Sequence, residues 1–245
     1  MQSANLWNKF NLQCCKIIAA TVLLLLCCSQ AHAQKKRWVE KNNPNYDDRT
    51  LTYGFLIGLH TTTYQVNYAD KFVTPDMDRI HSVVPNWKYG FSLGFIVNYR
   101  LNEQLDFRIT PKVAFYEHEL NYNYVDNTPT TTKLVETTVV ELPLLLKYKS
   151  ERRGNIRMYM IGGIKPGIEA SGQKESKEAT VEMKKNNLSL EAGFGFDLYY
   201  PLFKFSPEIR FSHGILNMLK NSTNEFGAPL DRVNTNTITI YFLFQ

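Results

Sequence analysis

Residues 87–99 read WKYGFSLGFIVNY and alternate between two kinds of side chain. One set is bulky and apolar or aromatic: Trp87, Tyr89, Phe91, Leu93, Phe95, Val97 and Tyr99. The other set is small or mostly polar: Lys88, Gly90, Ser92, Gly94, Ile96 and Asn98. Because successive side chains of a strand point to opposite faces, the stretch predicts a strand with one apolar face and one narrow face. Lipid covers such an apolar face directly if the strand belongs to a closed transmembrane barrel.

The same alternation recurs along the chain and predicts eight strands in total. These are residues 51–68, 87–99, 105–115, 135–148, 156–168, 188–199, 203–212 and 237–244. The connections between them alternate in length. Long loops are expected at 69–86, 121–134, 170–187 and 214–236, the last with a helical turn at 215–220, and short turns at 100–104, 149–155 and 201–202. Up-and-down barrels of the outer membrane have this asymmetry, with short periplasmic turns and longer extracellular loops.

The predicted fold class is therefore all-β, an eight-stranded antiparallel up-and-down transmembrane β-barrel over residues 51–245. The soluble alternative is a lipocalin-like barrel, whose apolar side chains would face inward around a ligand. The set that alternates with the bulky residues is narrow and rich in glycine, as in Gly193 and Gly195 of LEAGFGFDLYY. Small residues suit the crowded inside of an eight-stranded barrel, which favours the membrane barrel.

The N-terminal segment has the layout of a signal peptide over residues 1–33. Lys9 and Lys16 precede an apolar run at 17–28, and Ala31-His32-Ala33 predicts cleavage between Ala33 and Gln34. The run is shorter than the roughly 20 apolar residues that a transmembrane helix needs. A lipoprotein leader is the other alternative because Cys27 and Cys28 end the run, but Leu26 stands where a small residue is expected. Residues 34–50 are polar and aperiodic and predict a flexible periplasmic arm.

All four cysteines of the 245-residue chain, Cys14, Cys15, Cys27 and Cys28, lie in this leader. The exported chain would then have neither a disulfide framework nor a cysteine site. The formal net charge is +5, and positive and negative residues are interspersed, so a nucleic-acid partner is not expected. Outer-membrane lipid, including lipopolysaccharide, is the expected surrounding.

Many charged residues fall on the face predicted to point into the barrel. They are Asp106, Arg108, Lys112, Glu141, Lys147, Arg157, Lys165, Glu191, Asp197, Lys204, Glu208 and Arg210. Charges in a narrow lumen persist only if they are paired or hydrated, so we expect a structural ion-pair network. A proton or ion path is the functional alternative, but eight strands leave little room for a channel.

A lipid A-modifying barrel enzyme is the sharpest catalytic hypothesis. Ser212 and His213 are adjacent, and His118 lies near the outer end of its strand. Adjacent strand residues point to opposite faces, however, and no G-x-S-x-G motif is present. His60 and His81 lack metal-ligand spacing. We therefore expect no catalytic, metal or cofactor site, no cofactor and no small-molecule substrate.

Three segments resemble a known family: ELPLLLKY at 141–148, LEAGFGFDLYY at 190–200 and FSHGIL at 211–216. The chain resembles the PorT (SprT) family of small outer-membrane β-barrels from the Bacteroidetes, which is linked to the type IX secretion system. The resemblance implies a role in exporting cargo such as proteases, gliding motility in some relatives, and other type IX secretion subunits as partners. It supplies no catalytic residues. A stand-alone structural or adhesion barrel is the alternative function.

Overall fold

The computed structural model describes residues 41–73, 80–125, 131–170, 183–220 and 228–245. Residues 41–245 form one compact unit. The predicted signal peptide, its cleavage site at Ala33 and Gln34, and residues 34–40 of the predicted arm lie outside the described residues. Within the described part, no helix has the length and apolar character to cross a membrane.

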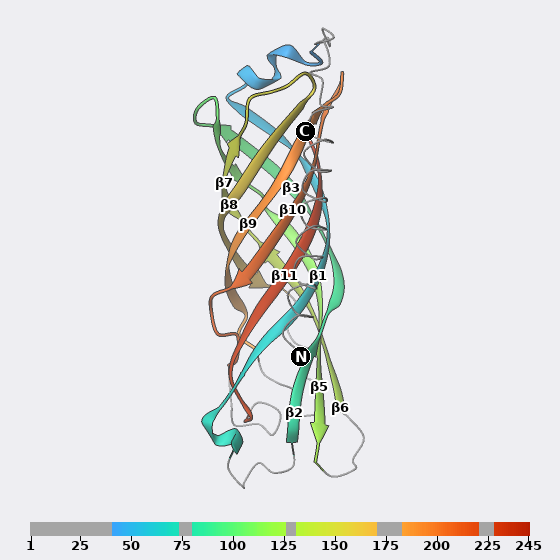
Figure 1. The fold of residues 1–245 in the computed structure, drawn as a ribbon, viewed down its shortest axis with the longest axis vertical. Coiled ribbons are helices and arrows are strands. Elements are labelled where there is room, and N and C mark those ends of the chain that lie inside the picture. The colour runs from blue at the N-terminus through green and yellow to red at the C-terminus, as the bar shows by residue number, and fades with distance from the viewer. Residues whose placement is uncertain (1–40, 74–79, 126–130, 171–182, 221–227) are drawn as a thin grey trace, which may run out of the picture. The chain divides into compact units, whose positions relative to one another are not determined.

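The described chain is built from antiparallel strands that close into a barrel (Figure 1). The strands are β1 (Leu51–Tyr68), β2 (Ile80–Asn86), β3 (Lys88–Arg100), β4 (Leu105–Ile109), β5 (Lys112–Tyr124), β6 (Thr131–Glu141), β7 (Leu144–Lys149), β8 (Ile156–Glu169), β9 (Asn186–Tyr199), β10 (Lys204–Gly214) and β11 (Leu230–Phe244). Two 3-10 helices, η1 (Pro44–Asp48) and η2 (Asp70–Val73), accompany them. Strand β1 pairs with β11, and β8 pairs with β9, so the ring has no open end.

The eleven described segments form eight strands of the barrel wall, which we call staves. Three of these staves, β2–β3, β4–β5 and β6–β7, are each interrupted once. Two of the interruptions fall at Pro111 and Pro143, and proline has no N–H to donate to a ladder. The proline carbonyls nevertheless keep neighbouring staves joined. Phe95 N–H donates to Pro111 at 2.9 Å, Thr110 N–H to Pro143 at 3.1 Å, and Leu142 N–H to Pro166 at 3.0 Å. The prediction of an eight-stranded antiparallel barrel is confirmed in this sense.

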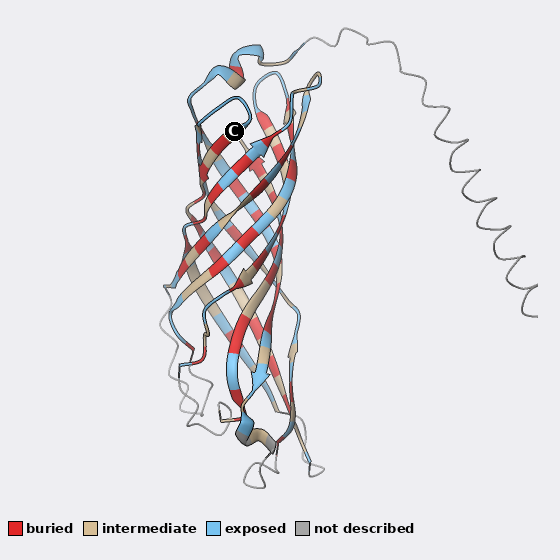
Figure 2. Ribbon diagram, turned by 60° about the vertical axis from the view of Figure 1, so that its left-hand side comes forward, coloured by how far each residue is buried: buried red, intermediate tan, exposed pale blue. Residues whose placement is uncertain are grey.

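The two faces of the wall have opposite character in the half that contains the short turns. Buried and exposed residues alternate along its strands (Figure 2). In β3, Tyr89 and Phe95 are 83% and 70% exposed, whereas Ser92 and Ile96 are fully buried. Gly94 faces inward against β5, where an added Cβ would lie 2.5 Å from Lys112 Cβ. The narrow face of residues 87–99 thus makes room for a long charged side chain of the next stave.

In the half that contains the long connections, this pattern is reversed. Its interior is an apolar cluster of Tyr64, Ile80, Val83, Leu120, Tyr122, Met183, Leu219, Leu230 and Val233. Its outer surface includes polar side chains such as Gln65 and Asn67, which are exposed. Such a wall resembles a soluble barrel, since apolar side chains face inward and polar side chains face water. The barrel therefore extends past the lipid-facing band as a folded, water-facing section, which we call the outer section.

The predicted long loops are correspondingly too long. Strand β2 occupies 80–86, β5 continues to Tyr124, β6 begins at Thr131 and β11 begins at Leu230, all within segments predicted as loops. Pro85 of the first predicted loop lies on β2, and Asn121 and Asn123 of the second lie on β5. The helical turn predicted at 215–220 is also absent, because Leu219 forms an antiparallel bridge with Met183 instead.

Candidate functional site: the charged interior and the plug at its short-turn end

The structure places eleven of the twelve predicted interior charges inside the barrel, each at most 4% exposed. These eleven are Asp106, Arg108, Lys112, Glu141, Lys147, Lys165, Glu191, Asp197, Lys204, Glu208 and Arg210. Arg157 is the twelfth, and it lies at the short-turn end, where it pairs with Asp47 at 3.1 Å. The eleven interior charges come from the consecutive strands β4 to β10, and their inward direction follows from the strand period.

Three carboxylates act as centres around which the other groups are arranged. Asp197 accepts hydrogen bonds from Lys147 Nζ and Ser206 Oγ, both at 2.6 Å. Glu208 accepts from Arg108 at 2.9 Å and from the Tyr159 hydroxyl at 2.6 Å, and it also contacts Arg210.

Glu141 is the third centre and lies nearest the outer section. It pairs with Lys112 at 3.0 Å and with Lys165 at 3.1 Å, and the Tyr116 hydroxyl donates to it at 2.7 Å. Two or more donors on each carboxylate offset much of the cost of removing these charges from water. The network therefore fills the interior with charged side chains, most of which are paired.

Lys149 is an interior charge that the sequence prediction missed. Its Nζ lies 2.6 Å from Asp106, and the prediction had assigned the residue to the turn at 149–155. The strand period continues through Leu145, Lys147 and Lys149, which are all buried, so the signal was present in the sequence. Lys204 faces inward too, with its Nζ 4.7 Å from the centre of the Tyr46 ring.

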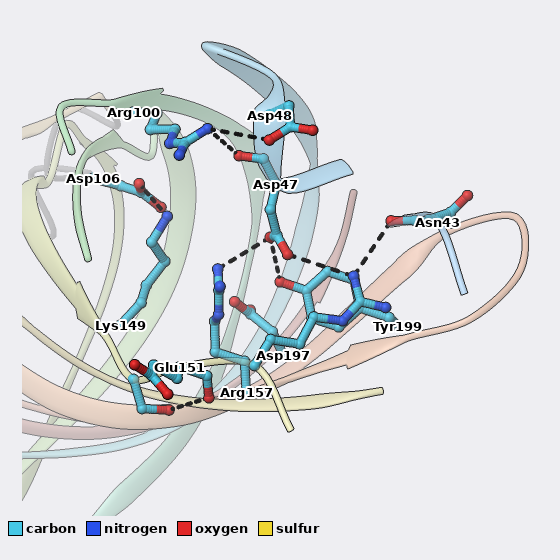
Figure 3. Close-up of polar contacts among 12 residues, drawn as sticks. Asn43, Asp47, Asp48, Arg100, Asp106, Lys149, Glu151, Arg157, Asp197 and Tyr199 are labelled. Atoms are coloured by element: carbon cyan, nitrogen blue, oxygen red, sulfur yellow. Dashed lines mark hydrogen bonds and ion pairs between the residues drawn. The ribbon is translucent and has the colours of Figure 1, made fainter. Parts of the chain in front are cut away.

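Residues 42–49, which we call the end plug, lie against the short-turn end of the barrel (Figure 3). The sequence predicts a flexible arm over residues 34–50, and in its described part several side chains contact η1. Asn43 takes a left-handed conformation, with φ of 48°, and Pro44 follows as the first helical residue. Asparagine tolerates the left-handed region and proline is pre-formed for a helix start, which explains the local fold.

Asp47 is the main contact between the end plug and the wall. One of its carboxylate oxygens accepts from Arg157 at 3.1 Å and from the Tyr199 hydroxyl at 2.7 Å. The other accepts from Arg152 at 3.5 Å, and the guanidinium of Arg152 lies 3.7 Å from the centre of the Tyr199 ring. Figure 3 shows Arg157 and Tyr199 converging on Asp47 beside the Asp106–Lys149 pair. The end plug thus continues the interior network to the end of the barrel.

Tyr46 is the apolar contact of the end plug. Its ring is buried and meets Tyr199 edge to face, with ring centres 5.9 Å apart. Burial raises the pKa of its phenol to about 12, so the group is neutral at physiological pH. No feature of the sequence other than an isolated aromatic residue after Pro44 indicated this contact.

The residues of the catalytic hypothesis do not form a nucleophile and base pair. Ser212 is buried inside the barrel, whereas His213 lies on the other face of β10 and contacts Asn236 at 2.6 Å. His118 is buried and stacks on Tyr64, with ring centres 4.1 Å apart.

His60 is also buried, and its ring lies tilted against that of Tyr116 with ring centres 4.4 Å apart, whereas His81 is exposed on β2. Across the ranges that the structure describes, no group of three or more His, Cys, Asp or Glu side chains is placed to hold a metal ion.

A closed antiparallel wall with an apolar outer band and a charged interior defines an outer-membrane β-barrel. A family model described as "Outer membrane protein beta-barrel domain" matches residues 32–220, and the chain belongs to this family. The protein is accordingly located in the outer membrane.

Among solved structures, the chain is similar to the outer membrane protein OprG from Pseudomonas aeruginosa, with 12% identity, a TM-score of 0.44, and coverage of 78% of this chain and 93% of OprG. It is also similar to Neisserial surface protein A, with 11% identity, a TM-score of 0.38 and coverage of 80% and 98%. A third is Ail, the attachment invasion locus protein of Yersinia pestis, with 12% identity, a TM-score of 0.35 and coverage of 78% and 96%. No curated protein sequence matches the chain.

The pairing of Lys147 with Asp197 can be tested by stability measurements. Lys147→Met leaves the buried Asp197 carboxylate without its cation, and removing one partner of a buried pair costs about 3–5 kcal/mol in unfolding free energy. We expect that loss in urea unfolding of the protein refolded into lipid vesicles. The double variant Lys147→Met/Asp197→Leu should recover most of it, since no unpaired charge is then left. A Lys147→Met protein as stable as the wild type would contradict the pairing.

The role of Asp47 can be tested by hydrogen exchange. Asp47→Asn removes the negative charge that faces Arg152 and Arg157, so the backbone amides of η1 should exchange faster with solvent. The matched control is Asp48→Asn, because the Asp48 side chain is 79% exposed and its carboxylate lies 3.9 Å from Arg100. Equal exchange rates in the two variants would show that Asp47 does not hold the end plug.

Proposed function

We propose that this outer-membrane barrel is a non-enzymatic component of the type IX secretion system. The proposal rests on the resemblance to the PorT (SprT) family and on one structural observation, the filling of the interior by paired charges. A barrel whose interior is occupied acts through its ends and outer surface, and a docking role in a larger secretion machine requires only those.

Two of the three segments that carry the resemblance lie within the barrel wall. ELPLLLKY spans the junction of β6 and β7 and contributes Glu141 and Lys147 to the interior, and LEAGFGFDLYY contributes Glu191 and Asp197 from β9. These segments support the barrel itself. We therefore expect contacts with other secretion subunits at surfaces that these two segments leave free, among them the two ends.

The short-turn end offers one such surface. A hollow of about 320 Å³ beside the end plug is lined in part by Glu103, Gln104, Ser150 and Glu151, next to Arg152 and Arg157. Its mixed charges and open position suit a polar protein contact of the kind found at the rim of interfaces. By the general topology of outer-membrane barrels this end faces the periplasm.

A stand-alone structural or adhesion barrel is the second candidate, and the outer section favours it. Its polar outer surface extends the barrel beyond the lipid-facing band, where it would meet the surface layer or an external ligand. A lipid A-modifying enzyme gains no support from Ser212 and His213, which lie on opposite faces of β10.

Deletion of the gene is the direct test of the secretion role. We expect the deletion strain to retain cargo proteases in the periplasm, measured by protease activity in culture medium and in periplasmic extract, and the wild-type gene to restore export. Photo-crosslinking from Glu103 and Glu151 should capture secretion subunits, whereas crosslinking from Gln65 in the outer section serves as the comparison. Normal export in the deletion strain, together with a loss of surface attachment, would favour the adhesion barrel instead.

A further inference from the structure

The wall of the outer section is interrupted between β1 and β2. Strand β1 pairs with β3 from Leu51 to Thr62 and with β11 as far as Tyr68. Strand β2 continues the β3 stave outward and pairs with β5. Within the described residues no ladder joins β2 to residues 63–68 of β1, and the two strands diverge (Figure 1). We call this interruption the seam.

The β1 edge of the seam carries backbone groups that have no strand partner among the described residues. The Thr50 carbonyl accepts from Arg100 N–H of β3 at 2.8 Å, and backbone groups of successive strand residues point to alternate sides. Because the pairing of β1 with β11 is regular through this part, the N–H and C=O groups of Tyr64 and Val66 point toward the seam. Those of Gln65 point toward β11.

On the β2 side, the Tyr68 hydroxyl occupies the position of a strand partner. It accepts from Val83 N–H and donates to the Val83 carbonyl, both at 3.0 Å. One side-chain oxygen therefore satisfies the two backbone groups that a neighbouring strand would pair with. The next seam-facing residue of β2 is Pro85, and proline within a sheet is confined to edges because it has no N–H. The bond to Tyr68 is thus the contact that an added strand has to replace.

The interior behind the seam is apolar on both sides. Tyr64 from β1 and Val83 from β2 belong to the buried cluster of the outer section, with exposures of 5% and 2%. A strand placed in the seam directs every second side chain toward this cluster and the others toward water. Apolar residues at alternate positions of that strand therefore extend the cluster.

We propose that the seam binds an extended peptide segment of another protein, which pairs with the β1 edge at Tyr64 and Val66 and displaces the Tyr68 hydroxyl from Val83. Main-chain hydrogen bonds supply the affinity, and the alternation of apolar and polar side chains supplies the specificity. The long connections of outer-membrane barrels face the cell exterior, so the segment belongs to a protein of the cell surface or the medium. The site is independent of the secretion role proposed above.

Binding can be tested with the full chain purified in detergent and a fluorescent peptide that copies residues 119–124, ELNYNY, which pair with β2 in the barrel. The matched control is the same peptide with its backbone amides N-methylated, which keeps every side chain but donates no main-chain hydrogen bond. Fluorescence anisotropy should show at least tenfold weaker binding of the control peptide, because several net hydrogen bonds are lost.

Three variants of the chain sharpen this test. Tyr68→Phe removes the hydroxyl that competes for Val83 and should tighten binding about fivefold. Val66→Pro removes an N–H that faces the seam and should weaken binding about fivefold. Val66→Ala keeps that N–H and should bind within about twofold of the wild type. Heat-modifiable gel migration shows whether each variant is folded.

Hydrogen exchange tests the seam itself. In the free protein the Val66 amide should exchange at least tenfold faster than the Gln65 amide, which faces β11, and the peptide should slow it. Equal protection of the two amides in the free protein would show that the chain itself covers the seam and would overturn the proposal.

Other results would also overturn it. They are failure of the unmodified peptide to bind, equal binding of the two peptides, and unchanged binding by Tyr68→Phe. A dimer of the free protein that the peptide dissociates would assign the seam to a second copy of this chain instead. If Val66→Pro does not fold, Tyr68→Phe and the exchange of the Val66 amide decide the matter.

Discussion

The structure depends on the burial of charged side chains inside a narrow barrel. Lipid requires every backbone group of the wall to be paired, which closure of β8 on β9 and of β1 on β11 achieves. Once the wall is closed, its inward side chains have little water, so each carboxylate requires cations and hydroxyls around it. Asp197, Glu208 and Glu141 meet this requirement through Lys147, Arg108 and Lys165, at distances of 2.6 Å, 2.9 Å and 3.1 Å respectively.

The outer face of the barrel wall contacts lipid along one half of the barrel and water along the other. In the half with short turns, apolar residues face lipid and charges face inward, and in the outer section apolar residues such as Tyr122 and Val233 face inward instead. The change occurs without any change of fold, because each strand has two faces and only the sequence on them differs. The end plug closes the network at one end of the barrel through Asp47.

The sequence was sufficient to predict the barrel. Bulky apolar residues alternate with small or polar ones in residues 87–99 and in the other strands, and this alternation indicates which face of each strand contacts lipid. It was less informative where polar residues are carried on strands. Residues 120–124 read LNYNY, a period of two that is typical of a strand, but a loop is predicted from residue 121 onward. The end plug was not predictable, since Asp47 and Tyr46 contact Arg152 and Tyr199 far along the chain and no local pattern encodes such contacts.

The most direct test of the central claim is the electrical conductance of the purified protein in planar lipid bilayers. An interior filled by paired charges predicts that the wild-type protein inserts without stable single-channel current steps, whereas a sixteen-stranded porin in the same bilayers conducts through its water-filled lumen. Discrete, reproducible current steps that scale with salt concentration would show a continuous aqueous path and would contradict the filled interior.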